Sequence, residues 1–113
     1  MVYFSYPYSD NPKERSGEIK GKVKQILKAN PNLTPIIPHL AFDGLFDYPE
    51  GFTHPEILVM ELEAISRCDL LAYDPEHLST GVMWEIAFAK WLGKKVVTFK
   101  ELMVNGVESR VEK

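Results

Sequence analysis

Residues 68–99 read CDLLAYDPEHLSTGVMWEIAFAKWLGKKVVTF, and this stretch decides the fold. It places a helical segment, Gly81–Leu92, between two short runs of β-favouring apolar residues, Asp69–Tyr73 and Lys95–Phe99. A strand, a helix and a second strand in this order usually form a unit whose two strands lie parallel. The stretch therefore predicts part of an open α/β sheet.

The preceding residues continue this alternation of strands and helices. Strands are predicted at Val2–Tyr6 and Leu33–Ile37, and helices at about Lys13–Ala29 and Pro55–Arg67. The whole order predicts an α/β fold: a single-domain, three-layer, doubly wound (Rossmann or flavodoxin-like), mostly parallel sheet of about four to five strands. All 113 residues are expected to belong to this one domain.

Two regions stand outside this pattern. Residues 38–53 are predicted to form a long loop rich in Pro, Gly, Asp and aromatic residues. Loops of this length usually serve as lids or binding segments when they are not disordered. From Val104 onward the sequence predicts no element.

Composition narrows the classes of function. The net charge of −3 and the pI near 5.6 give no basic footprint for a nucleic acid polymer. No apolar run approaches the about 18 residues of a membrane span, and the N-terminus lacks a basic leader followed by an apolar stretch. The single Cys68 cannot form an intrachain disulfide, which agrees with a reducing compartment. We therefore expect a cytoplasmic protein with no membrane partner.

Glu85 is the chemical outlier of the sequence. At about 100° per residue, it lies in the middle of the apolar arc of its helix. The other members of that arc are Val82, Ile86, Ala89 and Leu92. Burying an unpaired charge costs several kcal/mol or more, so such a carboxylate is usually paired, hydrogen-bonded or kept for a function.

A second glutamate interrupts the preceding helix in the same way. Glu61 lies among Ile57, Leu58, Leu62 and Ile65 on the inward stripe. One interpretation is a carboxyl pair with split pKa values, in which one member is ionised and the other protonated. The alternative makes Glu61 an edge residue and Glu85 a first-turn glutamate stabilised by the helix dipole. Periodicity alone leaves both open.

The predicted topology indicates where a ligand would bind. In open parallel sheets, ligands bind beyond the carboxyl ends of the strands, where the strand order reverses. The segments that converge there are residues 5–11 and 74–81, and the second leads directly into the helix of Glu85.

Several short motifs resemble one family, the nucleoside 2-deoxyribosyltransferase superfamily, which includes the 2'-deoxynucleoside 5'-phosphate N-hydrolases. They are the strand opening CDLLAYD, the segment STGVMWEIAFAKWLGKKVV and the first strand VYF. The resemblance covers roughly residues 1–100 and is strongest from Glu61 to Phe99. It implies a domain of this type for the chain as a whole.

The resemblance also implies catalytic roles. Glu85 falls on the nucleophile, Tyr3 on the tyrosine that supports it, and Glu61 on an acidic residue near base and sugar. Asp69 is a weaker candidate than Glu61 for handling the proton, and its position suits a structural role at the start of a strand. The implied reaction is cleavage or transfer at the N-glycosidic bond of a (deoxy)nucleoside or nucleoside 5'-monophosphate.

The substrate is less well defined by the sequence. The residues SYPYS at 5–9 replace the glycine-rich turn of the better-known members. Ser79 stands where the transferases tend to have Asp and the hydrolases have Ser; a hydroxyl at a helix N-terminus suits a phosphate, although Ser is also an ordinary helix cap. By spacing, Ser109 matches a phosphate contact donated to a neighbouring subunit. The candidate substrate-binding residues are Ser5, Tyr6, His39, Asp69, Ser79, Thr80, Gly81 and Ser109.

No cofactor or metal is expected. The three histidines, His39, His54 and His77, lack the spacing of metal ligands. His39 borders the long loop and could line the pocket, whereas His54 reads as a helix-start residue and His77 as a loop residue.

A stripe of Trp84, Phe88 and Trp91 adjoins the face of Glu85. Together they make an apolar arc of roughly 200°, which is more than one sheet face usually covers. The excess predicts a homodimer or higher homo-oligomer. The alternative is an intrachain contact from the long loop or the tail.

Three functions remain possible at this stage. The first is the N-glycosidic enzyme, acting on a small-molecule nucleoside or nucleotide. The second is a non-catalytic nucleotide-binding or sensor module on the same fold, since a fold does not settle a function. The third is an interaction protein that uses the aromatic stripe.

Overall fold

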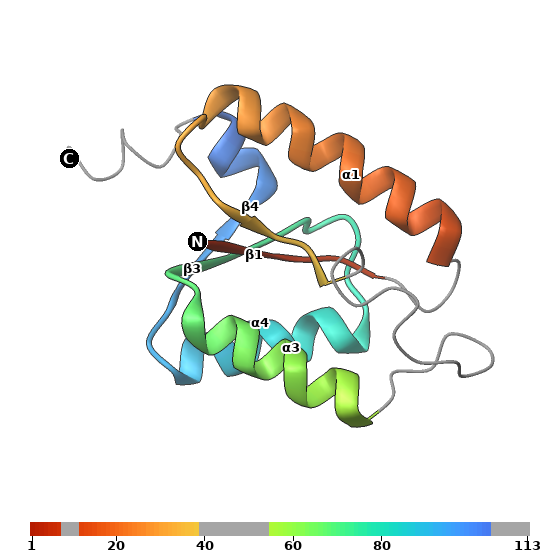
Figure 1. Ribbon diagram of the computed structural model, residues 1–113, viewed down its shortest axis with the longest axis vertical. Helices are drawn as coiled ribbons and strands as arrows, with labels where there is room; N and C mark the ends of the chain where they lie inside the picture. The colour runs from red at the N-terminus through yellow and green to blue at the C-terminus, as the bar shows by residue number, and fades with distance from the viewer. Residues whose placement is uncertain (8–11, 39–54, 105–113) are drawn as a thin grey trace.

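A computed structural model describes residues 1–7, 12–38 and 55–104 (Figure 1). Its sheet has four parallel strands in the order β2-β1-β3-β4. The strands are β1 (Val2–Ser5), β2 (Pro35–Ile36), β3 (Leu70–Tyr73) and β4 (Lys95–Thr98). The α/β prediction is confirmed, and the order identifies a doubly wound sheet whose direction of growth reverses between β1 and β3.

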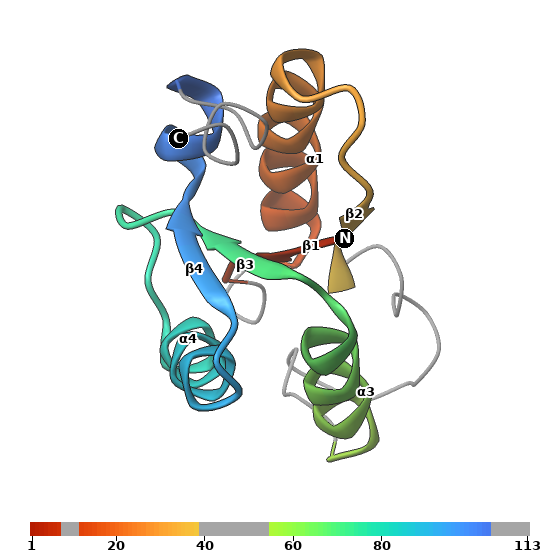
Figure 2. The same ribbon diagram turned by 90° about the vertical axis from the view of Figure 1, so that its left-hand side faces the viewer.

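Helices cover both faces of this sheet. The helices are α1 (Pro12–Ala29), α3 (Pro55–Arg67) and α4 (Thr80–Trp91), followed by a helical segment at residues 99–104. Figure 2 shows α1 and residues 99–104 on one face and α3 with α4 on the other. The α4 helix ends where Gly93 adopts a left-handed conformation, with φ of 77°, which only glycine takes at little cost. Within the described ranges, no helix is long and apolar enough to cross a membrane.

The helical segment at residues 99–104 was not predicted, and it begins with a capping box. The backbone N–H of Thr98 donates to Oε1 of Glu101 at 2.8 Å, and the N–H of Glu101 donates to Oγ1 of Thr98 at 3.1 Å. The reciprocal pair satisfies two backbone donors at the helix start. The chain therefore turns into a helix directly after β4.

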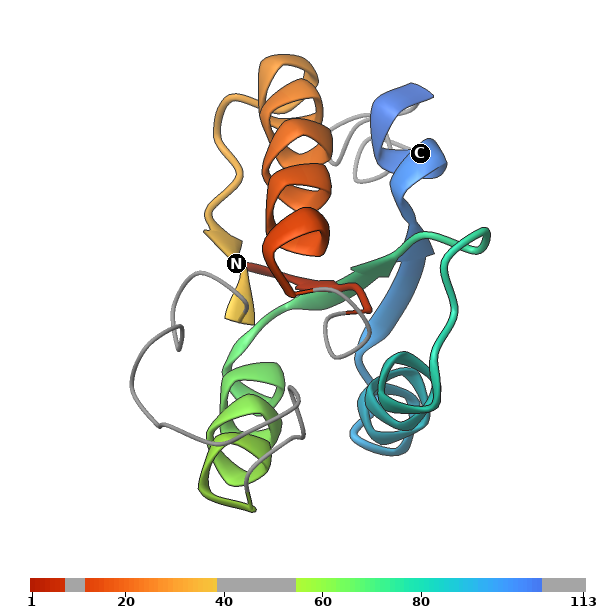
Figure 3. The ribbon, with the colours of Figure 1, turned by 90° about the vertical axis from the view of Figure 1, so that its right-hand side faces the viewer.

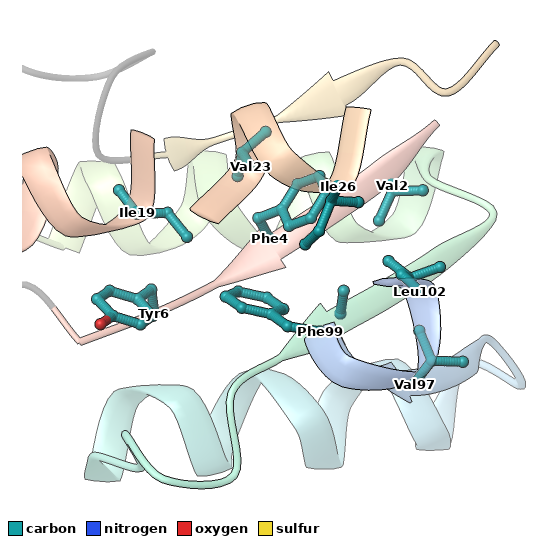
Figure 4. Packing of buried hydrophobic residues seen from close by; sticks show 10 residues of the cluster. Val2, Phe4, Tyr6, Ile19, Val23, Ile26, Val97, Phe99 and Leu102 are labelled. Atoms are coloured by element: carbon teal, nitrogen blue, oxygen red, sulfur yellow. The ribbon is translucent and has the colours of Figure 1, made fainter. Parts of the chain in front are cut away.

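Alternation along β1 sorts its side chains between two cores. Val2, Phe4 and Tyr6 pack against α1 and residues 97–102 (Figure 4). Tyr3 packs on the other face, in the cluster that contains Ile65, Cys68, Leu71 and Ala89. Because successive residues of a strand point to opposite faces, Ser5 joins Tyr3 on the α3 and α4 face.

The carboxyl ends of β1 and β3 meet at the reversal point. Ser5 is the register partner of Tyr73, so the chain leaves both strands side by side at this edge. Figure 3 looks onto the edge, with α1 on one side of it and α3 and α4 on the other. Residues 39–53 of the predicted long loop and the tail after Val104 lie outside the described residues.

Candidate functional site

The site is built around Glu85, which is 8% exposed on the inner face of α4. Tyr3 Oη donates a hydrogen bond of 2.7 Å to Oε2 of Glu85, and Ser5 Oγ donates one of 2.5 Å to Oε1. Both donors come from β1 and are fully buried. Each carboxylate oxygen therefore has its own hydroxyl donor, which fixes the plane of the carboxylate.

The simpler interpretation of Glu85 as a first-turn glutamate is wrong. The α4 helix begins at Thr80, and its first turn contains no acidic residue. Because the effect of the helix dipole falls off beyond the first turn, it does not account for a carboxylate in the second turn. The hydroxyls of Tyr3 and Ser5 are its partners instead.

Burial shifts the ionisation of this glutamate toward neutral pH. Loss of solvent raises the pKa of Glu85 from 4.5 to about 7, and the hydrogen bonds from Ser5 and Tyr3 partly offset the rise by stabilising the carboxylate. Burial and the nearby carboxylates raise the pKa of Tyr3 well above its usual 10, so its hydroxyl stays protonated as a donor. Burial thus favours the protonated form of Glu85, and the two hydroxyls favour its ionised form.

Glu61 is the second carboxyl on this side of the sheet. It lies half-buried on α3, and burial together with the charge of Glu85 raises its pKa from 4.5 to about 8. The hydroxyls of Ser5 and Tyr3 favour the ionised form of Glu85, whereas both causes that act on Glu61 favour its protonated form. Two interacting carboxyls, one inclined to ionise and one inclined to stay protonated, can supply a nucleophile and an acid.

The N-terminus of α4, the helix that carries Glu85, is a further part of the site. Ser79 is the N-cap, with extended backbone angles, and its Oγ accepts the N–H of Val82 at 3.2 Å. The structure thus shows the capping role that Ser residues often have. A hydroxyl that accepts one hydrogen bond still has its O–H to donate. The exposed residues Thr80 and Gly81 follow in the first helical turn.

Two of the predicted substrate-binding residues lie away from Glu85. Tyr6 is on the opposite face of the sheet, where its hydroxyl donates to Oε1 of Glu18 at 2.9 Å, because it is one residue out of phase with Ser5. Asp69 precedes β3 at the amino end, where it is exposed and pairs with the N-terminal ammonium of Met1 at 2.7 Å. Asp69 therefore does not reach the carboxyl edge.

Two further candidates, His39 and Ser109, fall outside the described residues, as does His54. The structural description of the site therefore rests on β1, α3, α4 and the segment between β3 and α4.

A cluster around Asp74, which follows β3 directly, was not predicted from the sequence. Its Oδ2 lies 3.3 Å from Nζ of Lys22 on α1 and 3.0 Å from Nδ1 of His77. The available signal was an acidic residue at the carboxyl end of a central strand, followed three positions later by histidine. Across the described part of the chain, no group of three or more His, Cys, Asp or Glu residues could hold a metal ion.

Comparisons with known proteins give one family and one fold. The sequence model of a family described as "Domain of unknown function (DUF7768)" matches residues 1–99. No curated protein sequence matches the chain.

Among solved structures, the chain is similar to a 2-desoxiribosyltransferase from Leishmania mexicana, with a TM-score of 0.62 and 20% sequence identity. The match covers 86% of this chain but only 61% of that one, so the chain spans less than two thirds of the solved enzyme. At this identity the similarity shows a shared fold.

Proposed function

The chain belongs to this family of unknown function (DUF7768), and we propose that it is an enzyme of the N-glycosidic bond. Its reaction would be cleavage or transfer on a (deoxy)nucleoside or nucleoside 5'-monophosphate, with Glu85 as the nucleophile. The observation that supports this most is the buried carboxylate of Glu85, oriented by the hydroxyls of Tyr3 and Ser5 at the carboxyl edge of the sheet.

The chemistry of this bond needs such a group. Breaking it develops positive charge on the sugar and negative charge on the departing base. A carboxylate beneath the anomeric carbon stabilises the cation and can bond to that carbon to form a glycosyl-enzyme intermediate. A carboxylate has about four acceptor positions, so Glu85 keeps lone pairs for the sugar after accepting from Tyr3 and Ser5.

Glu61 would supply the proton. In its protonated state it can donate to the leaving base as the glycosidic bond breaks, which avoids the release of an anion. The resulting carboxylate can then take a proton from water or from an acceptor base that attacks the intermediate. This exchange returns both glutamates to their starting states.

The N-terminus of α4 supports a nucleotide, rather than a nucleoside, as the substrate. Ser79, Thr80 and Gly81 begin α4, where backbone N–H groups and the helix dipole favour an anion. A 5'-phosphate on the sugar would be such an anion, and Ser79 has an O–H to donate to it.

A homodimer is a further part of the proposal. Trp84 and Trp91 on α4 are 62% and 80% exposed, and the ring of Trp91 stacks on Phe88 with centroids 6.1 Å apart. Exposed tryptophans that share one helix face are typical of surfaces that bury against another chain.

A panel of nucleosides and nucleoside 5'-monophosphates, with and without an acceptor base, tests the enzyme proposal. Free base is measured by chromatography. We expect release of base by the wild type and at least about 10³-fold less by Glu85→Gln, which keeps the shape of the side chain but cannot act as a nucleophile. The matched control is Glu63→Gln on α3, an exposed residue whose partner is Arg67.

Binding without release of base across the panel would replace this proposal with the nucleotide-sensor function. A Glu85→Gln protein that retains full activity would remove Glu85 from the mechanism. If neither binding nor release occurs, the interaction function is favoured.

A further inference from the structure

The cluster of Asp74, His77 and Lys22 lies at the carboxyl edge of the sheet, on its α1 side. Asp74 is 7% exposed and accepts three hydrogen bonds or ion-pair contacts. They come from the backbone N–H of Glu76 at 3.0 Å, Nδ1 of His77 at 3.0 Å and Nζ of Lys22 at 3.3 Å. Asp74 thus joins its own loop to α1 and holds an imidazole and an ammonium on one carboxylate.

Asp74 fixes the orientation of His77. Because a carboxylate only accepts, Nδ1 of His77 is the donor. In the protonated imidazole Nε2–H is a second donor, which is left to bind an anion. The ring lies against Tyr6, with centroids 5.2 Å apart, and the side chain is 33% exposed. The imidazole is therefore held by one nitrogen and by one face while part of it remains accessible.

The two sides of the sheet edge differ in the cationic side chains that they carry. Glu61 and Glu85 lie on the α3 and α4 side, and among the described residues no cation contributes to the pKa of either. On the α1 side, Lys22 and His77 share the carboxylate of Asp74, and Arg15 pairs with Glu18. On the second side, the ammonium of Lys22 and the imidazole of His77 keep further N–H groups that can donate to an anionic group on a ligand.

We infer that His77, oriented by Asp74 and flanked by Lys22, recognises the phosphate of a nucleoside 5'-monophosphate at this edge. The inference rests on the proposed function and specifies its substrate class. His77 lies two residues before Ser79, the N-cap of the helix that carries Glu85. A ligand with its phosphate at this segment and its sugar at Glu85 would therefore cross the edge of the sheet. The segment 74–79 would then bind the anion on one side and position the nucleophile's helix on the other.

Binding measurements on a non-cleaving protein test this assignment. We would titrate the Glu85→Gln protein by calorimetry with the four 2'-deoxynucleoside 5'-monophosphates and with the matching nucleosides. We expect a monophosphate to bind roughly tenfold or more tightly than its nucleoside, the usual worth of a charge-assisted hydrogen bond. Adding His77→Asn should remove most of that difference and leave nucleoside binding unchanged.

Two substitutions at position 77 separate the two ring nitrogens. Asparagine places an amide near the position of Nδ1 and can keep the contact with Asp74, but it has no group at Nε2. Glutamine reaches the position of Nε2 and should restore part of the phosphate preference. On α1, Lys22→Met should also weaken monophosphate binding, while the exposed Lys20→Met serves as its matched control.

A measurement that does not depend on glycosidic chemistry separates this inference from the proposed function. The imidazole signals of His77 are followed by NMR during titration with inorganic phosphate. Saturable shifts that Lys22→Met weakens support the anion site, even if no base is ever released. A phosphate preference that persists in His77→Asn, or nucleoside cleavage dependent on Glu85 with no response of His77 to phosphate or monophosphates, overturns it.

Discussion

Ser5 Oγ lies 2.5 Å from Oε1 of Glu85, although the two residues are 80 positions apart in the sequence. The contact exists because Ser5 is the last residue of β1 and points to the α4 side of the sheet. Tyr3, two residues earlier on the same side, reaches the other carboxylate oxygen. A strand with two hydroxyls at alternate positions therefore holds a carboxylate that its own helix would otherwise leave without donors.

Removing either hydroxyl should raise the pKa of Glu85. Both hydrogen bonds stabilise the carboxylate, so Ser5→Ala and Tyr3→Phe favour the protonated form. Because a nucleophile must be ionised, the acidic limb of the rate profile should move to higher pH. We expect kcat/KM at pH 7 to fall by about tenfold for each variant, in line with the loss of one hydrogen bond to a charged group.

The control for this prediction is Tyr6→Phe, which removes a hydroxyl from the residue that follows β1, on the opposite face of the sheet. A rate profile of Ser5→Ala that keeps its acidic limb while activity falls would show that Ser5 acts through something other than the ionisation of Glu85.

The carboxyl pair should make the protein less stable as the pH rises. The folded-state pKa values of Glu61 and Glu85 are raised to about 8 and about 7, from 4.5 in the unfolded chain. The folded state therefore binds more protons between these values. The stability that this extra proton binding contributes is fully present below about pH 4.5, and it is lost as the pH rises through the folded pKa values.

Replacing Glu61 by Gln should reduce this dependence. The substitution removes a charge that is costly to ionise in the folded state, so the variant should exceed the wild type in free energy of unfolding at pH 9. The gain should be on the order of 1 kcal/mol, since Glu61 is only partly buried, and it should vanish near pH 4. Urea titrations at both pH values measure it, and a gain that is equal at both would refute the ionisation argument.

Part of this site could be predicted from the sequence, because it depends on local periodicity. Glu85 and Glu61 break apolar helical stripes, and such a break is visible without coordinates. The side of the sheet that each strand residue faces was harder to assign, since a one-residue difference separates Ser5, which contacts Glu85, from Tyr6, which does not. Asp69 was placed correctly at the start of its strand, and that amino end lies opposite the carboxyl edge at which Glu85 and Ser5 meet.

The helix at residues 99–104 was not predicted, although a capping box marks its start in the sequence. Its capping box is readable as Thr98-Phe-Lys-Glu101, but no long apolar repeat follows it, and periodicity alone does not detect so short a helix. The cluster around Asp74 could not be found in this way, because its partner Lys22 lies on α1, 52 positions earlier in the sequence. The angle of that helix across the sheet is set by tertiary packing.

Asn30 should contribute strongly to stability. It is 1% exposed at the end of α1, and its Nδ2 donates to the carbonyl of Ile26 at 2.9 Å and to that of Leu102 at 3.0 Å. Asn30→Leu would leave the carbonyl of Leu102 without this buried donor and should lower the free energy of unfolding by about 1–3 kcal/mol. Urea denaturation measures the loss, with the exposed Lys28→Leu on the same helix as control; equal stability of both variants would show that the amide contributes nothing.

The tryptophans of α4 should decide the oligomeric state. Trp84 and Trp91 lie seven residues apart on one helix face, so a two-fold axis beside α4 would pair the same stripe on both subunits. We expect the wild type to sediment as a dimer at micromolar concentration and the Trp84→Glu, Trp91→Glu double variant as a monomer, because a charge at each position would be buried at the interface. Met103→Glu, an exposed apolar residue on the other side of the sheet, should leave the dimer intact. A wild type that is monomeric over this range, or a dimer that tolerates both charges, would mean that the stripe is not the interface.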